Sequence, residues 1–334
     1  MKINPRISVI VIAYQRKKFI MTALESLFKQ SFSKDLFEII VVKNFIDTEI
    51  DKFIKANKVK NIYTDTPDLG NKCINGIENS SGEIIVFLED DDFFASNRLE
   101  VINKVFEDEE VVYFHNGHYL VDSKGNISKS SLFAKFNKDL RISKHNLKQT
   151  LARKALKVGF SFNLSSIAVR RSIFLSNLSS LRGMNIAIDN YMFYVSLASG
   201  KNLIATPLKL TYYRLHEDNS SLPSEENVDV LLLKAQKFLK SDLFGFKVID
   251  NIITDPLIKH LIECRMIEPR LNLHVINSSE VITMQDFTKA IKCGLMMRRI
   301  EPFLLVMVDL LSNRFKPLGT TLYIFYLKKK HKGK

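Results

Sequence analysis

Four consecutive acidic residues, Glu89 to Asp92, directly follow a short apolar run at residues 84–88. An uninterrupted apolar run of this length is typical of a strand that is buried on both faces of a parallel sheet. Adjacent carboxylates at the end of such a strand repel one another unless a cation gathers them. Hard divalent ions such as Mg²⁺ bind one or two carboxylates together with substrate phosphates. The run therefore predicts a metal ion and a phosphorylated substrate here, with a solvent-exposed acidic turn as the alternative.

The elements that would position this run alternate between strand and helix. Strand patterns occur at residues 7–13, 37–42, 61–64 and 84–88, and helical patterns at residues 17–30, 46–56 and 71–79. This alternation predicts βαβ units around a mainly parallel sheet, whose ligands bind beyond the carboxyl ends of the strands. Polar residues follow three of the strands, at residues 13–16, 43–44 and 89–92. We therefore expect three polar clusters to meet at one edge of the sheet.

The second half of the chain changes from mixed to helical patterns. Strands are expected at residues 111–121 and 127–132 (a hairpin across Gly125), within residues 160–171 and at residues 203–213, and a helix at residues 188–197. Beyond residue 220, amphipathic helical patterns dominate to about residue 299. We place a domain boundary near Leu222 and Pro223, so the chain divides into residues 1–222 and a helical region at residues 223–334.

Charge is concentrated at the C-terminal end of the chain. The 334 residues carry a net charge of +13, and residues 289–334 alone contain 11 Lys or Arg and 2 Asp or Glu, a net charge of +9. A basic character spread over the whole chain would favour nucleic acid as a partner. A basic end beside apolar segments instead favours an anionic membrane surface.

The three cysteines, Cys73, Cys264 and Cys293, are widely spaced and form no CxxC pair. This argues against a disulfide framework or a zinc site and predicts a reducing, cytoplasmic compartment. No apolar signal segment is expected at the start of the chain. No apolar stretch approaches 18 residues, so no ordinary transmembrane helix is expected.

Two segments near the C-terminus are apolar on nearly all sides. They lie at residues 303–308 and 318–327, and the sequence KKKHKGK follows them. The pattern predicts a monotopic anchor, with apolar side chains in the membrane interface and lysines at the headgroups. The alternative is a packed helical subdomain with a solvated tail.

Four segments of the chain resemble family 2 glycosyltransferases of the GT-A fold. They are SVIVIAYQR (8–16), LFEIIVV (36–42), GIENSSGEIIVFLEDDD (76–92) and YYRLHEDNSS (212–221). The resemblance covers roughly residues 6–221. It implies an α/β fold with a Rossmann-like, mainly parallel sheet flanked by helices, a donor-binding half at about 1–125 and an acceptor half at about 126–222. It also implies transfer of a sugar, with inversion, from a nucleoside-diphosphate sugar to a hydroxyl.

The resemblance assigns a role to each acid of the run. FLEDDD aligns with the family's metal motif so that Glu89 and Asp91 occupy its two acidic positions. Asp91 is then the first ligand of Mn²⁺ or Mg²⁺, with Asp92 close behind, and Glu89 reaches the ion through water. Asp90 is the spacer beside the donor and is expected to be solvated. His216, in the closing segment, is expected near the ion or the diphosphate, with a surface residue as the alternative.

The resemblance also implies a general base and a set of donor contacts. GMNIAIDNYMF (183–193) matches the family's Glu-Asp pair, with Ile188 in place of the first acid and Asp189 as the base; helix capping is its alternative role. Lys43 stands where an Asp usually reads the nucleobase, which leaves Asn44 for that role. The residues expected to contact the donor are Ala13, Tyr14, Arg16, Asn44, Lys72, Asp90 and Arg214.

Several alternatives remain open from the sequence. A non-catalytic module that binds sugar nucleotides is favoured by Lys43 and by the missing acid at Ile188. A nucleic-acid binder is supported only by the overall charge. His115 and His118 could share a metal only across a bend, because residues three apart on a strand face opposite sides. The acceptor is expected to be a lipid-linked glycan, a polysaccharide or a protein.

Overall fold

The computed structural model describes residues 5–128, 137–143, 159–216, 228–276, 280–297 and 303–307. The chain divides into two compact units, Met1–Leu215 and His216–Lys334, which we call the sheet unit and the helical unit. The boundary expected near Leu222 and Pro223 falls outside the described residues.

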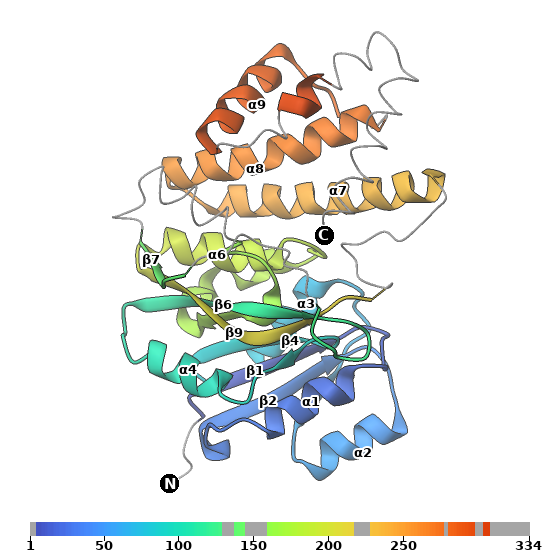
Figure 1. Ribbon diagram of the computed structural model, residues 1–334, viewed down its shortest axis with the longest axis vertical. Coiled ribbons are helices and arrows are strands. Elements are labelled where there is room, and N and C mark those ends of the chain that lie inside the picture. The colour runs from blue at the N-terminus through green and yellow to red at the C-terminus, as the bar shows by residue number, and fades with distance from the viewer. Residues whose placement is uncertain are drawn as a thin grey trace. The chain divides into compact units, whose positions relative to one another are not determined.

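A nine-stranded sheet organises the described part of the sheet unit, in the order β3-β2-β1-β4-β8-β6-β9-β5, with β7 paired to β9 (Figure 1). The first four strands in this order are parallel neighbours. The strands are β1 Ile7–Ala13, β2 Phe37–Lys43, β3 Lys60–Tyr63, β4 Ile84–Glu89, β5 Phe93–Phe94, β6 Val111–Val121, β7 Leu140–Ile142, β8 Ile167–Arg170 and β9 Asn202–Arg214. The expected parallel βαβ arrangement is therefore confirmed.

Helices cover both faces of this sheet. They are α1 Ile20–Phe28, α2 Thr48–Ala56, α3 Leu69–Glu78, α4 Arg98–Val105 and α6 Ile188–Ala198. Figure 1 shows α1 and α4 on one face and α6 on the other. Alternate residues of β1 follow this division: Val9 and Val11 join the core with α1 and α4, whereas Ile10 meets α3 at Gly76. The fully buried β1 thus packs on both faces, as its uninterrupted apolar run predicts.

The expected hairpin around Gly125 differs from the structure. The turn is present, because Asp122 and Asn126 are hydrogen-bonded across it. However, β6 pairs along its length in parallel with β9, and Ile127 makes a single bridge to Val121. Residues 129–136 lie outside the described residues. Pairing with β9 brings residues 212–214 beside β5, next to the acidic run.

The helical unit contains α7 Val228–Ile252, α8 Pro256–Val275 and α9 Met284–Met297. Asp255 caps α8, and Pro256 occupies its first turn, where a missing backbone N–H costs nothing. The core of this unit includes Leu271 of α8, Ala290 of α9 and Leu305 of the helical segment 303–307. The expected run of helices after the sheet is therefore confirmed.

The expectation of unpaired cysteines is wrong for two of the three. Cys264 of α8 and Cys293 of α9 form a disulfide, with their Cα atoms 5.4 Å apart. They are distant in sequence, but the packing of α9 on α8 brings them within ordinary bonding range. Cys73 is free and buried. The cysteines therefore no longer support a reducing compartment.

Of the two apolar segments near the C-terminus, the described residues include 303–307. Among the described residues, no helix combines the length and the apolar character needed to cross a bilayer. Leu305 and Val306 of the predicted anchor pack into the core of the helical unit. The second apolar segment, at residues 318–327, and the lysine-rich end lie outside the described residues.

Candidate active site

The three polar clusters meet at one edge of the sheet. Ala13 of β1 is in register with Lys43 of β2, and Ile12 is in register with Glu89 of β4. The residues that follow these strands therefore leave the sheet side by side. Ala13 itself is fully buried and Tyr14 is 39% exposed, so the opening of this edge begins at Tyr14.

Arg16 binds two of the four acids with its guanidinium fork. Its Nη2 lies 2.7 Å from Asp90 Oδ1, and its Nη1 lies 2.7 Å from Asp91 Oδ2. The backbone N–H of Tyr14 also donates to Asp90 Oδ2, at 3.2 Å. Asp90 is consequently 1% exposed, so its expected role as a solvated spacer is wrong. The physical reason is that the chain after β4 turns this carboxylate back onto residues 14–16.

The turn after β1 has a strained residue, Gln15, which is hydrogen-bonded to the segment after β2. Gln15 has a φ of 56°, in the left-handed region that few non-glycine residues adopt. Its backbone N–H donates to Asn44 Oδ1 at 2.8 Å. The side chain of Asn44, expected to read the nucleobase, therefore also holds the turn after β1 in place.

Arg16 only partly compensates the negative charge of the acidic run. Removal from water, together with the Asp91 and Asp92 carboxylates, raises the pKa of Glu89 well above its usual range. Burial and Asp91 likewise raise the pKa of Asp92. Burial raises the pKa of Asp90 to about 7, although Arg16 opposes the shift. A cation at this edge would relieve that repulsion.

The donor atoms at this edge suit a hard divalent ion. Asp91 is 7% exposed, and Asp90 and Asp92 are each 1% exposed. Among the described residues, no group of three or more His, Cys, Asp and Glu side chains has metal-site geometry. The carboxylates fit such an ion in chemical type, and the guanidinium of Arg16 contacts Asp90 and Asp91 in this structure.

Arg214 holds the acidic turn from the β9 side. Its backbone N–H donates to Asp92 Oδ1 at 2.9 Å, and its Nε donates to the Asp91 carbonyl at 2.8 Å. Its Nη1 donates to the carbonyls of Asp122 and Ser123. Arg214 is 3% exposed. These contacts position the carboxylates of the turn, whereas the sequence predicted that Arg214 contacts the donor.

Asp189 lies in the first turn of α6 and is partly exposed. Its Oδ1 accepts from the backbone N–H of Asn190 at 2.8 Å, and its Oδ2 accepts from that of Asn163 at 3.2 Å. The N-cap position belongs to Ala187, in the left-handed conformation, so Asp189 is not the N-cap residue. A carboxylate in the first turn is favoured by the helix dipole.

Asn163 and Ser165 connect Asp189 to the acidic run. Asn163 donates its backbone N–H to Asp189, and Ser165 Oγ accepts the backbone N–H of Glu89 at 3.0 Å. Both side chains also face Asp92, where they oppose the rise of its pKa. Sequence reasoning missed both residues. The positive φ of Asn163, 67°, is a conformation that Asn tolerates better than most residues, but it leaves no signature in a single sequence.

A chain of buried hydrogen bonds connects Arg98 to Ser165. Arg98 is fully buried; its Nε donates to Asn116 Oδ1 at 2.9 Å. Asn116 Nδ2 donates to Thr211 Oγ1 at 2.9 Å, and that hydroxyl donates to the Ser165 carbonyl at 3.1 Å. Burial lowers the pKa of Arg98 to about 9, and the charge of Asp92 opposes the shift. Sequence reasoning did not single out Arg98.

The start of α3 contacts the loop before α6. Gly70 donates its backbone N–H to the Met184 carbonyl at 2.8 Å, and Gly183 donates to Asp68 Oδ1 at 3.3 Å. A Cβ on Gly70 would lie 1.8 Å from the Leu181 carbonyl oxygen. Glycine is therefore required at position 70, and this close contact fixes the loop that leads to Asp189.

Two buried lysines near the site bind carbonyl or carboxylate groups of the protein. Lys72 is 1% exposed; its Nζ donates to the carbonyls of Thr66 and Pro67, each at 2.9 Å. The same Nζ lies 4.4 Å from the centre of the Tyr14 ring. Lys43 Nζ lies 2.9 Å from Asp51 Oδ1. Lys43 thus binds α2 through Asp51, and Lys72 packs on one face of the Tyr14 ring.

His115 and His118 are strand residues whose pKa values are lowered by burial. His115 is buried, with Nε2 2.7 Å from the Phe162 carbonyl, and burial lowers its pKa to about 3. Burial also lowers the pKa of His118 to about 4. His216 begins the helical unit and is partly exposed. Its expected place beside the ion stays a prediction.

The sequence matches the family described as Glycosyl transferase family 2 over residues 8–176. A *Campylobacter jejuni* protein named GalNAc(5)-diNAcBac-PP-undecaprenol beta-1,3-glucosyltransferase is 34% identical over 154 residues, which cover 42% of this chain and 46% of that protein. The putative glycosyltransferase EpsH of *Bacillus subtilis* is 28% identical over 223 residues, 64% of this chain and 62% of that protein. The chain thus spans less than two thirds of these relatives.

Two solved structures share the fold. *S. aureus* TarS 1–349 in complex with UDP-GlcNAc has a TM-score of 0.61 at 16% identity, covering 97% of this chain and 92% of that one. The mannosyltransferase PcManGT of *Pyrobaculum calidifontis*, in complex with GDP-Man and Mn²⁺, has a TM-score of 0.53 at 14% identity, covering 98% and 87%. The family match over half of the sequence, together with the shared fold, shows that this chain has the GT-A fold and belongs to glycosyl transferase family 2.

Proposed function

We propose that this glycosyltransferase is metal-dependent and inverting, and that it moves a hexose from a nucleoside-diphosphate sugar to an acceptor hydroxyl. The observation that carries the proposal is the link through residues 163–165. It joins the acidic run, where a diphosphate and its ion would bind, to Asp189, a partly exposed carboxylate. The two chemical requirements of the reaction, a stabilised leaving group and a base, are thereby held in one hydrogen-bonded segment.

On the donor side, Tyr14 and Asn44 would border the nucleoside, and Arg16 would reach the diphosphate. The opening at Tyr14 and the ion pairs of Arg16 with Asp90 and Asp91 support this assignment. Arg16 reaches the acidic turn through a side chain that is 29% exposed, so it can exchange partners when a phosphate arrives.

Asp91 would hold Mn²⁺ or Mg²⁺, with Glu89 and Asp92 beside it. The raised pKa values of Glu89 and Asp92 support this assignment, because burial and the neighbouring carboxylates both disfavour their charged forms in the absence of a further cation. When bound, such an ion stabilises the negative charge that develops on the departing diphosphate. Arg16 contributes a second positive charge at the same edge.

Asp189 is the general base of the proposed reaction. Its carboxylate takes the proton of the acceptor hydroxyl as the oxygen attacks the anomeric carbon, and the bond from that carbon to the nucleoside diphosphate breaks on the opposite side. The backbone N–H groups of Asn163 and Asn190 orient the carboxylate. The buried Ile188 leaves Asp189 as the acid of this segment.

The acceptor is proposed to be a lipid-linked glycan, with another glycoconjugate as the wider class. The *C. jejuni* relative, whose name specifies an undecaprenol-linked substrate, supports this choice. Peripheral association with a membrane follows from such an acceptor. A cytoplasmic location stays a prediction that the cysteines no longer support.

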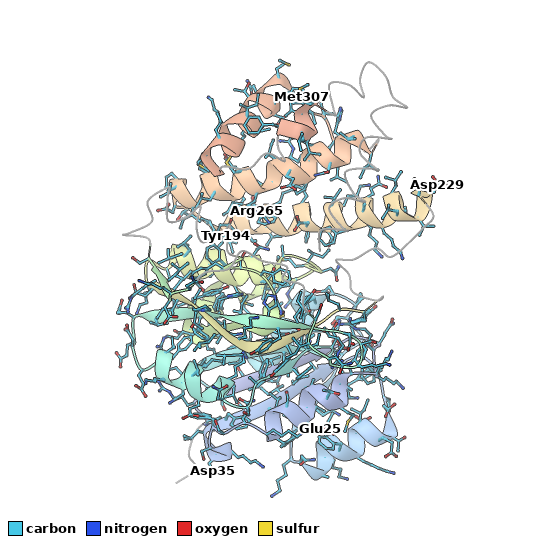
Figure 2. The ribbon with its side chains drawn as sticks, viewed as in Figure 1. Glu25, Asp35, Tyr194, Asp229, Arg265 and Met307 are labelled. Atoms are coloured by element: carbon cyan, nitrogen blue, oxygen red, sulfur yellow. A yellow bond between two sulfur atoms is a disulfide. The ribbon has the colours of Figure 1, made fainter. Side chains whose placement is uncertain are left out.

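The test measures nucleoside-diphosphate release from UDP-, GDP- and dTDP-sugars, with Mn²⁺, Mg²⁺ or a chelator. One donor should be turned over, and chelation or Asp91→Asn should lower the rate about 10²-fold or more. The matched control is Asp35→Asn, an exposed acid of the same unit (Figure 2), which should leave the rate unchanged. Turnover that is indifferent to both chelation and Asp91→Asn would reject the metal role.

A second candidate, a sugar-nucleotide-binding module without catalysis, is favoured by one observation: Arg16 already forms ion pairs with Asp90 and Asp91, where the metal ion would bind. Asp189→Asn separates the two functions. A general base should lose about 10²–10⁴-fold in kcat while donor affinity, measured by calorimetry, survives. A wild-type protein that binds a donor but turns over none, in any metal and with lipid-linked acceptors, would establish the binding module instead.

A further inference from the structure

Exposed apolar side chains are concentrated in one stretch of the helical unit. Within the described part of residues 281–307, six large apolar residues are exposed: Val281, Met284, Ile291, Leu295, Leu304 and Met307 (Figure 2 labels Met307). Single exposed apolar residues are ordinary on protein surfaces, whereas a concentration of them marks an interaction site.

Three of these residues form a stripe along α9. Met284, Ile291 and Leu295 are separated by seven and four residues, which places them on one face of a helix. They are 75%, 40% and 65% exposed, respectively. The opposite side of α9 carries Ala290 and Cys293, which are buried. We call the first side the outer face of α9, defined by Met284, Ile291 and Leu295.

The inner side of α9 is already fixed, so the outer face is not needed to hold the helix. Cys293 is bonded to Cys264 of α8, and Ala290 lies in the core. Arg270 of α8 binds Asp286 of α9, with Nη1 2.5 Å from Oδ1. A helix that is held on one side and apolar on the other has a surface to offer to a second partner.

Positive charge borders the outer face. Lys292 is exposed and forms no ion pair among the described residues. Nearby acids are already paired: Glu263 lies 2.6 Å from Lys289, and Asp286 binds Arg270. A hollow of about 420 Å³ between α8 and α9 is lined by Met284, Lys289, Lys292 and His260, among others. The hollow thus combines apolar and cationic side chains, the two kinds of group that a lipid's methylenes and its anionic headgroup would contact.

We propose that the outer face of α9 is the surface by which this chain lies on an anionic lipid bilayer, with Met284, Ile291 and Leu295 in the interface and Lys292 at the headgroups. This deepens the peripheral membrane association included in the proposed function. Charge complementarity selects the occupant: Lys292 borders the face, and residues 289–334, most of which lie outside the described part, carry a net charge of +9 in the sequence, which disfavours a second copy of the chain. The apolar centre of the face disfavours nucleic acid, whose contacts are mainly to phosphates.

The test is sedimentation of the full chain with vesicles of phosphatidylcholine alone or with about 30% phosphatidylglycerol. Wild type should bind the anionic vesicles, and the combined variant Met284→Ser, Ile291→Ser, Leu295→Ser should bind them at least about tenfold more weakly. The matched control replaces three exposed apolar residues elsewhere, Ile46→Ser, Leu208→Ser and Leu233→Ser, and should bind as wild type does. Circular dichroism and donor turnover without vesicles verify that both variants fold.

Four results would overturn the proposal: no binding of wild type to anionic vesicles, equal binding by the α9 variant, a change from dimer to monomer in that variant, or loss of RNA binding in place of vesicle binding. The experiment also separates this surface from the proposed chemistry. Vesicle binding that depends on the stripe in a protein without donor turnover would support the surface and reject the transferase function.

Discussion

The two units of the chain depart from the ordinary distribution of side chains in opposite directions. Among the described residues, the sheet unit has five charged residues that are no more than 1% exposed: Lys43, Lys72, Asp90, Asp92 and Arg98. The helical unit instead exposes large apolar residues along residues 281–307. Each departure costs free energy if it serves folding alone, because buried charges lose hydration and exposed apolar groups order water.

The difference in buried charge and exposed apolar surface indicates where each unit binds its partners. In the sheet unit, Arg98 is hydrogen-bonded to Asn116, and Arg16 and Arg214 are bonded to the carboxylates at the sheet edge, so this edge is a polar site suited to a charged ligand. In the helical unit, the core is complete without the outer face of α9, so the exposed residues are available for an apolar partner. Substitutions that exchange these properties should therefore affect stability in one unit and association in the other.

Arg98→Met should give the largest loss of stability. It removes a buried cation, leaves Asn116 Oδ1 without the Arg98 donor and removes one of the positive charges near Asp92, so we expect a loss of about 3–5 kcal/mol in the free energy of unfolding. Urea denaturation measures it. The matched control is Arg141→Met, whose exposed ion pair with Asp108 contributes at most about 1 kcal/mol. Equal losses of stability in both variants would mean that buried Arg98 and its hydrogen bonds do not stabilise the sheet unit.

Removal of the disulfide should have the next largest effect. Cys264→Ala with Cys293→Ala opens a link across 29 residues, for which loop-closure entropy gives about 3–4 kcal/mol. Calorimetry with and without reductant measures the change. Wild type should lose stability in reductant, and the double variant should be insensitive to it. A wild type that does not respond to reductant would show that α9 is held by its core and the Arg270–Asp286 pair without the disulfide.

Leu295→Ala should have the smallest effect on stability, within about 0.5 kcal/mol, because its side chain is 65% exposed. Leu305→Ala in the same unit is the matched comparison. Leu305 is 1% exposed in the core, so its truncation should cost about 2–5 kcal/mol. Thermal unfolding of the two variants measures the difference. A large loss of stability in Leu295→Ala would mean that the outer face of α9 is part of the core. The helical unit would then have no spare apolar surface on α9.

Much of the fold follows from local patterns. The apolar run at β1 is predicted at residues 7–13 and observed at Ile7–Ala13. The alternation of such runs with amphipathic helices is enough to predict parallel strands, and the edge at which residues 14–16, 44 and 89–92 meet follows from that direction. The hairpin at Gly125 could not be resolved in the same way, because β6 pairs with β8 and β9, both of which lie far along the chain.

Within the site, the sequence marked the residues that chemistry requires but not those that hold them. Glu89, Asp91 and Asp189 are recognisable because acids in these positions match a family pattern. Asn163 and Arg98 act through hydrogen bonds to residues distant in sequence, and a single sequence contains no trace of those partners. The burial of Asp90 was mistaken for the same reason, since Arg16 and Tyr14 decide it.

By itself, the sequence determined the class of this protein: hydrophobic periodicity sets the strands and helices, and the acidic run after the fourth strand sets the chemistry of the edge. The tertiary structure alone decided which charges are buried together, which cysteines pair and which face of α9 is exposed. These properties depend on contacts between residues far apart in the chain, whose strength is determined by distance and by exclusion of water, and neither can be read from residue order.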